Sequence, residues 1–396
     1  MCIRDSKSSE SQRSPGKLLR AGLAGVAAMV GAAALTGGCL DRPVSPAVPR
    51  TNNIYVDEIR QNAVDKIDLL FMIDNSISMA DKQSILAEAV PLLVQRLITP
   101  ICVQGDGTPL NSSVDTTGNC AQGSPEFKPI NDIHVGVITS SLGSHGAAGT
   151  KDVCVATEDD DHAHLLGQIR NLPGTWNNQG FLKWDPKQKY TPPGDSAGAD
   201  FSTKFTAMVK SADENGCGYE ASLEAWYRFL IDPEPPATVS VEGDRAFPGA
   251  ADPVVLSQRA AFLRPDSLVA IVMLSDENDC SIVDEGYGWL IARQQSMFRS
   301  TSQCLADPNA ACCQSCGEQA ARSGCPAIDS DAQCQLGKTL TGMGEDDLNL
   351  RCWEQKRRFG FELLYPTTRY SEALRSPVVT QRSTGMPLQN PLFAPT

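Results

Sequence analysis

Three runs of nearly uninterrupted apolar residues predict buried β-strands in this chain. They are Ile67–Ile73, Ile133–Ile138 and Leu268–Leu274. An apolar run of this length is typical of a strand that is buried on both faces of a parallel sheet. The second run is also rich in β-branched residues, which favours a strand. Residues Gly180–Trp184 predict one further, short strand.

Polar loops and helical patterns separate these strands. After Met79 the apolar residues recur at helical spacing, at Ile85, Ala89, Leu92 or Leu93, and Leu97. Asp81 favours a helix N-terminus there, because its negative charge opposes the positive end of the helix dipole. Pro91 predicts a bend or a restart of that helix.

Two more helices are predicted at Phe201–Lys210 and Tyr219–Leu230, whereas residues 143–200 read mostly as loop. Strands that alternate with helices predict an α/β fold with an open, mostly parallel, doubly wound sheet. No comparable apolar run follows residue 276, and Pro377-Val378-Val379 is too short. We therefore expect that the sequence is truncated before its last strand.

The first 39 residues have the pattern of an export signal. Basic residues up to Arg20 precede an apolar stretch, Ala21–Leu35, which is shorter than a comfortable membrane span. Leu35-Thr36-Gly37-Gly38-Cys39 resembles the cleavage box of bacterial lipoproteins, with the leucine four residues before the cysteine instead of three. The resemblance implies that Cys39 carries lipid. The alternative is an ordinary secretory signal that is cleaved nearby.

Either signal places the rest of the chain outside the cytoplasm. Residues 40–53 contain three prolines and predict an extended tether, so the folded domain spans 54–396. Because Leu40 is not the aspartate that commonly retains such proteins at the inner membrane, we expect an outer-membrane lipoprotein, periplasmic or surface-exposed. Residues 1–6 fit no part of the signal and are interpreted as a start-site or assembly artefact.

Composition narrows the class of protein. The chain has 396 residues, of which 41% are hydrophobic, so it can bury a core. Its formal net charge is -13, which argues against a surface that neutralises nucleic-acid phosphates.

The chain has 14 cysteines, and twelve remain when Cys2 in the signal and Cys39 are set aside. In an exported protein an even set predicts disulfides. The twelve are Cys102, Cys120, Cys154, Cys217, Cys280, Cys304, Cys312, Cys313, Cys316, Cys325, Cys334 and Cys352. The first two bracket a loop that they can close.

The last seven cysteines mark a cysteine-rich insertion, residues 304–352. Seven is an odd number, so at least one bridge must leave this cluster, and Cys280 is the nearest candidate upstream. Zinc is the alternative reading, because Cys313 and Cys316 form a C-x-x-C pair. A single such pair without a second pair or a histidine is a weak zinc signal, so the disulfide reading is preferred.

Polar residues that could bind a ligand directly follow two of the predicted strands. Asp74 follows the first strand and Asp276 the third, and in open α/β sheets ligands bind at the carboxyl ends of the strands. Asp74, Ser76 and Ser78 have D-x-S-x-S spacing. Hydroxyl and carboxylate oxygens suit magnesium, manganese or calcium. For a single Asp or Ser, a helix-capping role would explain the residue equally well; the ordered set with Asp276 favours a metal.

The D-x-S-x-S motif, with a strand before it and a helix after it, resembles the von Willebrand factor A (VWA) domain. The resemblance implies that Ser76 and Ser78 coordinate the ion directly and that Asp74 and Asp276 act mainly through water. A shell without a direct protein carboxylate would leave the ion electrophilic, so an acidic group of a partner could complete it, as in a metal-ion-dependent adhesion site. The loop that normally supplies a threonine, residues 216–220, has none.

The wider sequence is similar to uncharacterised cysteine-rich VWA lipoproteins of myxobacteria and their relatives. The resemblance covers residues 54–396 and is carried by 65–76, 216–220 and 275–280. This resemblance implies the fold, but it does not identify the ligand.

Other polar groups have competing readings. Glu158-Asp159-Asp160-Asp161 lacks the glycine and closing glutamate of a calcium loop, so a solvated acidic loop is preferred. Glu277 and Asp279 either extend the metal shell or face water. His162 and His164 either ligate a metal or are ordinary surface histidines.

These features favour a binding protein over an enzyme. The chain has no G-x-S-x-G, no H-E-x-x-H and no D-x-D phosphoryl-transfer loop. We expect it to bind an extracellular or periplasmic protein or glycan with an acidic group through its metal, Mg²⁺ or alternatively Mn²⁺ or Ca²⁺. The alternatives are a structural envelope protein with a vestigial metal site and a metal-dependent hydrolase.

Overall fold

The protein is built around a four-stranded mixed sheet with the strand order β6-β5-β1-β9. The computed structural model describes residues 65–147, 154, 160–293, 295–341 and 344–393. Contacts divide the chain into two units, 1–60 and 61–396, and every described residue belongs to the second. The predicted signal, Cys39 and the tether lie outside the described residues.

The central strand β1 (Lys66–Ile73) is parallel to both of its neighbours. It pairs with β5 (Asp132–Thr139) on one side and with β9 (Leu268–Leu274) on the other. The short strand β6 (Leu182–Trp184) runs antiparallel to β5 at the edge. The predicted strands are therefore confirmed, and the sheet is partly parallel.

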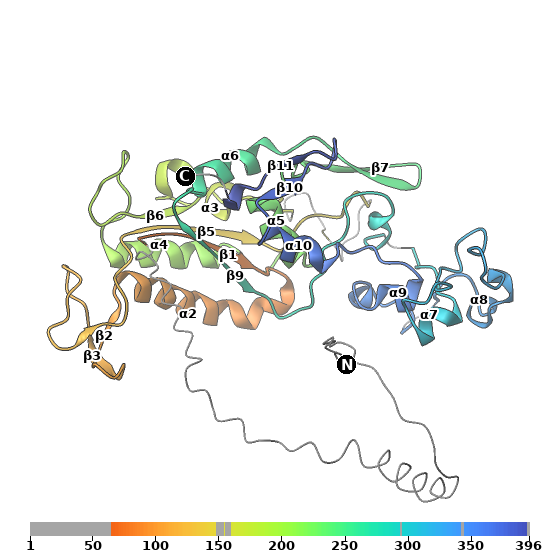
Figure 1. Ribbon diagram of the computed structural model, residues 1–396, viewed down its shortest axis with the longest axis horizontal. Helices are drawn as coiled ribbons and strands as arrows, with labels where there is room; N and C mark the ends of the chain where they lie inside the picture. Colours follow the sequence, from red (N-terminus) through yellow and green to blue (C-terminus); the bar gives the residue numbers. More distant parts are fainter. Residues whose placement is uncertain (1–64, 148–153, 155–159, 294, 342–343, 394–396) are drawn as a thin grey trace, which may run out of the picture. The chain divides into compact units, whose positions relative to one another are not determined.

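Helices cover both faces of this sheet, as Figure 1 shows. One face of β1, which includes Leu69 and Phe71, packs with α2 (Ala80–Ile98) and α4 (Gly198–Lys210). The other face, which includes Leu70 and Met72, packs against α5 (Ser222–Leu230) and α6 (Pro253–Phe262). The alternation of β1 side chains between two cores explains why its sequence is continuously apolar.

The helix predicted after Met79 is confirmed as α2, but most of the apolar residues that marked it do not lie on its buried face. Its buried apolar residues are Ala87, Val90, Pro91, Val94 and Ile98. By contrast Ile85 is 64% exposed and Leu92 is 66% exposed. Two apolar stripes with the same spacing run along this helix, and periodicity alone cannot choose between them. The helix also continues through Pro91 as one element.

Strand β9 is less buried than its sequence predicts. Among the described strands it pairs only with β1, which makes it an edge of the sheet. Leu268 and Met273 are exposed, although the whole strand is apolar. An apolar run therefore identified the strand correctly but not its position in the sheet.

The remaining elements are short. α5 begins three residues later than predicted, because residues 219–221 belong to a loop described below. The short apolar run Pro377-Val378-Val379 contributes to a strand of a small hairpin that lies outside the main sheet. The turn of another hairpin contains Gly243, whose φ of +66° is strained for other residues. The two hairpins are β7 (Val239–Glu242) with β8 (Arg245–Pro248), and β10 (Val378–Thr380) with β11 (Pro387–Gln389).

A second small sheet lies within the loop that follows α2. It consists of β2 (Ile101–Val103), β3 (Pro109–Ser113) and β4 (Ser124–Pro125). The other short helical elements are η1 (Ile77–Met79), α3 (Leu166–Ile169), η3 (Trp176–Asn178), η4 (Gly288–Leu290), α7 (Ser302–Ala306), η5 (Ile328–Ser330), α8 (Ala332–Gln335), η6 (Leu348–Leu350), α9 (Gln355–Phe359), α10 (Thr367–Ala373) and η7 (Pro391–Phe393). Within the described part of the chain, no helix is both long and apolar enough to cross a membrane.

All twelve cysteines after Cys39 are paired. Cys102 pairs with Cys120, closing the loop as expected, and Cys280 pairs with Cys352, which is the bridge out of the cysteine cluster that the odd count required. The other pairs are Cys154–Cys217, Cys304–Cys313, Cys312–Cys325 and Cys316–Cys334. Around Cys316 and Cys334 the buried apolar cluster adds only Ile328. Disulfides therefore replace a core there.

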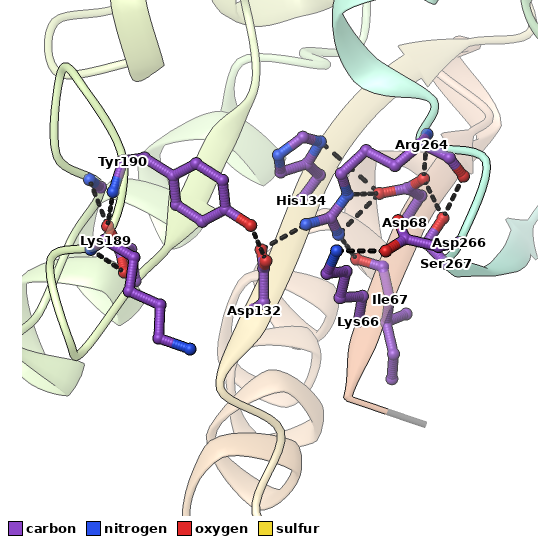
Figure 2. Close-up of polar contacts among 12 residues, drawn as sticks. Lys66, Ile67, Asp68, Asp132, His134, Lys189, Tyr190, Arg264, Asp266 and Ser267 are labelled. Atoms are coloured by element: carbon purple, nitrogen blue, oxygen red, sulfur yellow. Dashed lines mark hydrogen bonds and ion pairs between the residues drawn. The ribbon is translucent and has the colours of Figure 1, made fainter. Parts of the chain in front are cut away.

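A buried polar network fixes the amino ends of β1 and β5, at the sheet edge opposite to Asp74 (Figure 2). The Arg264 guanidinium donates to the Asp68 carboxylate at 2.8 Å and to the Ile67 carbonyl at 2.9 Å, and it also pairs with Asp132. Asp68 is fully buried and accepts a further bond from Ser267. Arg264 thus links the segment before β9 to β1 and to β5.

The His134 imidazole lies beside this network in a neutral form. It is 2% exposed, and its Nδ1 donates to the Phe262 carbonyl at 2.7 Å. Burial lowers the pKa of His134 to about 2, and the positive charges of Arg264 and Lys183 act in the same direction. Folding therefore requires this histidine to stay unprotonated.

We predict that His134 makes the protein less stable in mild acid. As the pH falls below about 6.5, the unfolded state binds a proton that the folded state excludes, so this group's contribution to stability is lost by up to about 1.4 kcal/mol per pH unit. Urea unfolding between about pH 6.5 and pH 4.5 should show a shallower pH slope for His134→Gln, whose amide can still donate to Phe262, than for the parent. Equal slopes would contradict this assignment.

We predict that the mature protein has no free thiol among these twelve cysteines and holds no stoichiometric zinc. Thiol labelling of unreduced, denatured protein with mass spectrometry, alongside elemental analysis, measures both. Because each native disulfide typically contributes about 2–5 kcal/mol, reduction should expose the cysteine-rich insertion to protease before the sheet. Several reactive thiols accompanied by one zinc per chain would reverse the assignment.

Candidate functional site

Asp74 is held in a fixed position where β1 ends. Its backbone N–H donates to the Leu274 carbonyl at 2.8 Å, which continues the pairing with β9. One carboxylate oxygen accepts from the Ser76 N–H at 2.9 Å and the other from the Ser275 hydroxyl at 2.7 Å. The side chain is fully buried. Asp74 therefore shapes the loop after β1 and places a negative charge beneath it.

The two serines of the motif form a chain of oxygen atoms with Asp276. Ser76 Oγ lies 2.9 Å from Ser78 Oγ, and Ser78 Oγ donates to Asp276 Oδ1 at 3.0 Å. The Ser76 side chain caps no backbone N–H of the helix that follows. The structure thus brings Asp74, Ser76, Ser78 and Asp276 together from two strand ends that are about 200 residues apart in sequence.

Lys82 is the basic residue next to this cluster. Its Nζ lies 2.9 Å from Asp276 Oδ2 and donates to the Ser78 carbonyl at 3.0 Å. The hydrogen bonds of Lys82 and Ser78 lower the pKa of Asp276, so its carboxylate is ionised. Lys82 lies one turn of helix after Ser78, and the spacing of the D-x-S-x-S motif does not predict it as a site residue.

A third loop, residues 216–221, brings Glu220 to the site. Glu220 is only 4% exposed, and the nearby Ser76 favours the ionised form of its carboxyl group. Burial raises the pKa of Glu220 to about 8, and the nearby charges of Asp74 and Glu277 add to this effect. A bound cation would favour the ionised form. This loop is where the sequence lacked the expected threonine, and the buried carboxylate there is the site residue that the motif could not reveal.

Asn75 holds the third loop against the first one. Its side-chain oxygen accepts from the Ser141 hydroxyl at 2.8 Å, and that hydroxyl accepts from the Cys217 N–H at 2.8 Å. The Asn75 carbonyl accepts from the Gly216 N–H at 2.8 Å. A Cβ at Gly216 would lie 2.3 Å from the Asn75 side-chain oxygen, so only glycine fits this close approach.

The end of the acidic run supports this arrangement and is not solvated as expected. Asp161 is 1% exposed, accepts from the Thr139 hydroxyl at 2.7 Å and pairs with Arg170 at 2.7 Å. Its neighbour Asn75 approaches the same carboxylate at 3.5 Å. Residues 155–159 lie outside the described part of the chain. The expectation of an exposed acidic loop is therefore wrong at Asp161.

The other weighed residues have structural partners. Asp279 accepts from the Leu223 N–H at 2.8 Å and so holds the start of α5, which is neither of the roles considered for it. Glu277 lines the cavity described next. The histidines contact carboxylates, His164 at 2.8 Å from Asp252 and His162 at 3.5 Å from Asp160.

A cavity of about 1060 Å³ opens over the oxygen cluster. Ser76, Ser78 and Glu220 line its floor, and Leu350 and Trp353 line it from the end of the cysteine-rich insertion and the residue after it. The Tyr219 hydroxyl donates to the Leu348 carbonyl at 3.2 Å. Insertion and site loop are thus in direct contact.

Arg351 fixes this wall of the cavity. The side chain is 1% exposed, pairs with Asp346 at 2.8 Å and donates to the carbonyls of Ile291 at 3.0 Å and Gln295 at 3.1 Å. Its neighbour Cys352 is bonded to Cys280, four residues after Asp276. One disulfide, Cys280–Cys352, and one ion pair, Arg351–Asp346, therefore hold Leu350 and Trp353 near the site.

The donor set fits a hard divalent cation. Hydroxyl and carboxylate oxygens converge there, and such oxygens are the preferred ligands of magnesium and calcium. Among the described residues no three histidine, cysteine, aspartate or glutamate side chains form a metal-binding group. An ion at this site would therefore depend on the serine hydroxyls and on water as well as on carboxylates.

Comparison with protein-family models, with curated proteins and with solved structures finds no match for this chain.

Proposed function

We propose that this protein is a metal-dependent binding module of the cell envelope, with a VWA-like domain and a metal-ion-dependent adhesion site. The observation that carries the proposal is the oxygen chain from Ser76 through Ser78 to Asp276, with Asp74 buried beneath it. The parallel strands β5, β1 and β9, covered by helices on both faces, support the VWA resemblance.

The proposed ion is Mg²⁺, with Mn²⁺ or Ca²⁺ as alternatives. Ser76 and Ser78 would hold it directly, and Asp74 and Asp276 would orient its water ligands. Such an ion supplies an electrophilic centre that an oxygen atom of a ligand can reach from the cavity. We propose binding of an extracytoplasmic protein or glycan, and not catalysis, as the use of this centre.

We predict that calorimetry detects one divalent ion per chain and that Asp74→Ala plus Asp276→Ala abolishes the signal. Because Asp74 is buried, Asp276→Ala alone is the gentler test, and it should weaken binding while the unfolding midpoint stays near that of the parent. Asp329→Ala, on an exposed part of the insertion, is the matched control. If the double variant titrates like the parent, the site is assigned wrongly. If the parent itself binds no ion, the metal site is refuted, and the alternative of a structural envelope protein with a vestigial site is favoured.

We propose further that Cys39 carries the lipid that anchors the domain in the outer membrane. Cys39→Ser should abolish incorporation of labelled fatty acid and move the protein from the membrane to the soluble fraction. Cys2→Ser, which changes the other cysteine of the signal, is the control and should change neither property. Continued labelling of the Cys39→Ser form would disprove lipid attachment at this residue.

A further inference from the structure

The charge of the cavity disfavours an anionic ligand. Glu214, Glu220 and Glu277 line it, and no lysine or arginine does so among the described residues. Asp74 and Asp276 bond to the lining residues Ser76 and Ser78, with Lys82 as a partial counter-charge. A bound dication would favour the ionised form of Glu220, which lies in the loop that would otherwise supply a neutral threonine, so carboxylates would already surround the ion. A ligand oxygen that adds no further negative charge fits this ion best.

The polar lining suits a ligand rich in hydroxyl groups. Besides the glutamates, Asn215, Asn278 and Asn349 line it from three separate loops. Carboxylates only accept hydrogen bonds, whereas amides both donate and accept. Hydroxyl groups can satisfy both kinds of partner and can also coordinate a hard cation through their lone pairs. An ammonium group could pair with the glutamates but has no lone pair for the ion.

Part of the cavity lining is apolar and aromatic. Trp353 is 52% exposed and Leu350 is 45% exposed, and Ile77, between the two serines of the motif, is 81% exposed. A half-exposed indole ring offers a flat apolar face with a polar edge. The ring of a sugar has a matching apolar face formed by its C–H groups.

These features together select a chemical class of ligand. We propose that the site binds a neutral glycan, whose hydroxyl groups coordinate the ion while one sugar ring packs on Trp353. The inference rests on the metal site proposed above. It narrows the ligand from a protein or glycan to a saccharide and replaces the acidic group expected from the sequence with neutral hydroxyl groups. Because Cys280–Cys352 and Arg351 fix the wall in advance, ligand binding need not order it.

The test is native affinity electrophoresis of the purified full-length protein in gels that contain dextran, mannan or laminarin as neutral probes. Gels with polygalacturonate, and a glutamate-containing peptide in calorimetry, are the acidic probes. We expect retardation by at least one neutral polysaccharide with calcium or magnesium present and none with chelator. Trp353→Ala should weaken it by about tenfold or more. Phe247→Ala, which removes an exposed aromatic ring that is not part of the cavity lining, should not.

Glu220→Gln tests the charge argument without changing the size of the side chain. It should raise binding of polygalacturonate relative to the neutral polysaccharide. A parent protein that binds the ion but no neutral probe, or that prefers an acidic probe, overturns the glycan inference and leaves the metal site standing. Retardation that survives both chelator and Trp353→Ala also overturns it, because the glycan then binds elsewhere. A parent that binds no ion refutes the proposed function itself.

Discussion

The burial of β1 on both faces is the constraint on which the rest of the structure depends. Seven of its eight residues are buried, and Leu69 and Leu70 point into different cores. Such a strand can accommodate a buried polar residue only where that residue is fully paired, as Asp68 is by Arg264. Other polar side chains can appear only after the strand has ended, and Asp74 is the first of them. Because β9 is parallel and in register, its polar residues Ser275 and Asp276 emerge at the same edge.

The cysteine-rich insertion turns this sheet edge into a cavity. The insertion has little core of its own, with Ile328 packed among cysteines. Disulfides restrict the unfolded chain, and Cys280–Cys352 returns the insertion to the loop that carries Asp276. Cys154–Cys217 ties the Glu220 loop in the same way. Both bridges lie within a few residues of site residues, so the covalent framework and the candidate site are built from the same loops.

Much of the scaffold could be predicted from sequence, because it depends on local patterns. The three long strands, the helix after Met79 and the positions of Asp74 and Asp276 follow from apolar runs and from where they stop. The buried face of α2 could not be predicted, since Ile85 and Val90 belong to stripes of equal apolar character and only the packing of α4 selects one. The role of Glu220 could not be predicted for a different reason. Its role depends on the Asn75 contact that draws a distant loop to β1, and no local spacing encodes that contact.

The contacts of Asp276 are compatible with both Lys82 and the proposed ion. Its two carboxylate oxygens face different partners, with Oδ2 on Lys82 and Oδ1 on the Ser78 hydroxyl. The proposed ion would take the place of the Ser78 hydroxyl proton as the partner of Oδ1, directly or through water. It would not have to displace the lysine from Oδ2. Lys82 is 40% exposed, so its charge is partly screened and repels the ion only weakly. In the proposed site, the lysine would orient the carboxylate for the ion, while the buried Asp74 carboxylate, and Glu220 once the ion favours its ionised form, would supply the attraction.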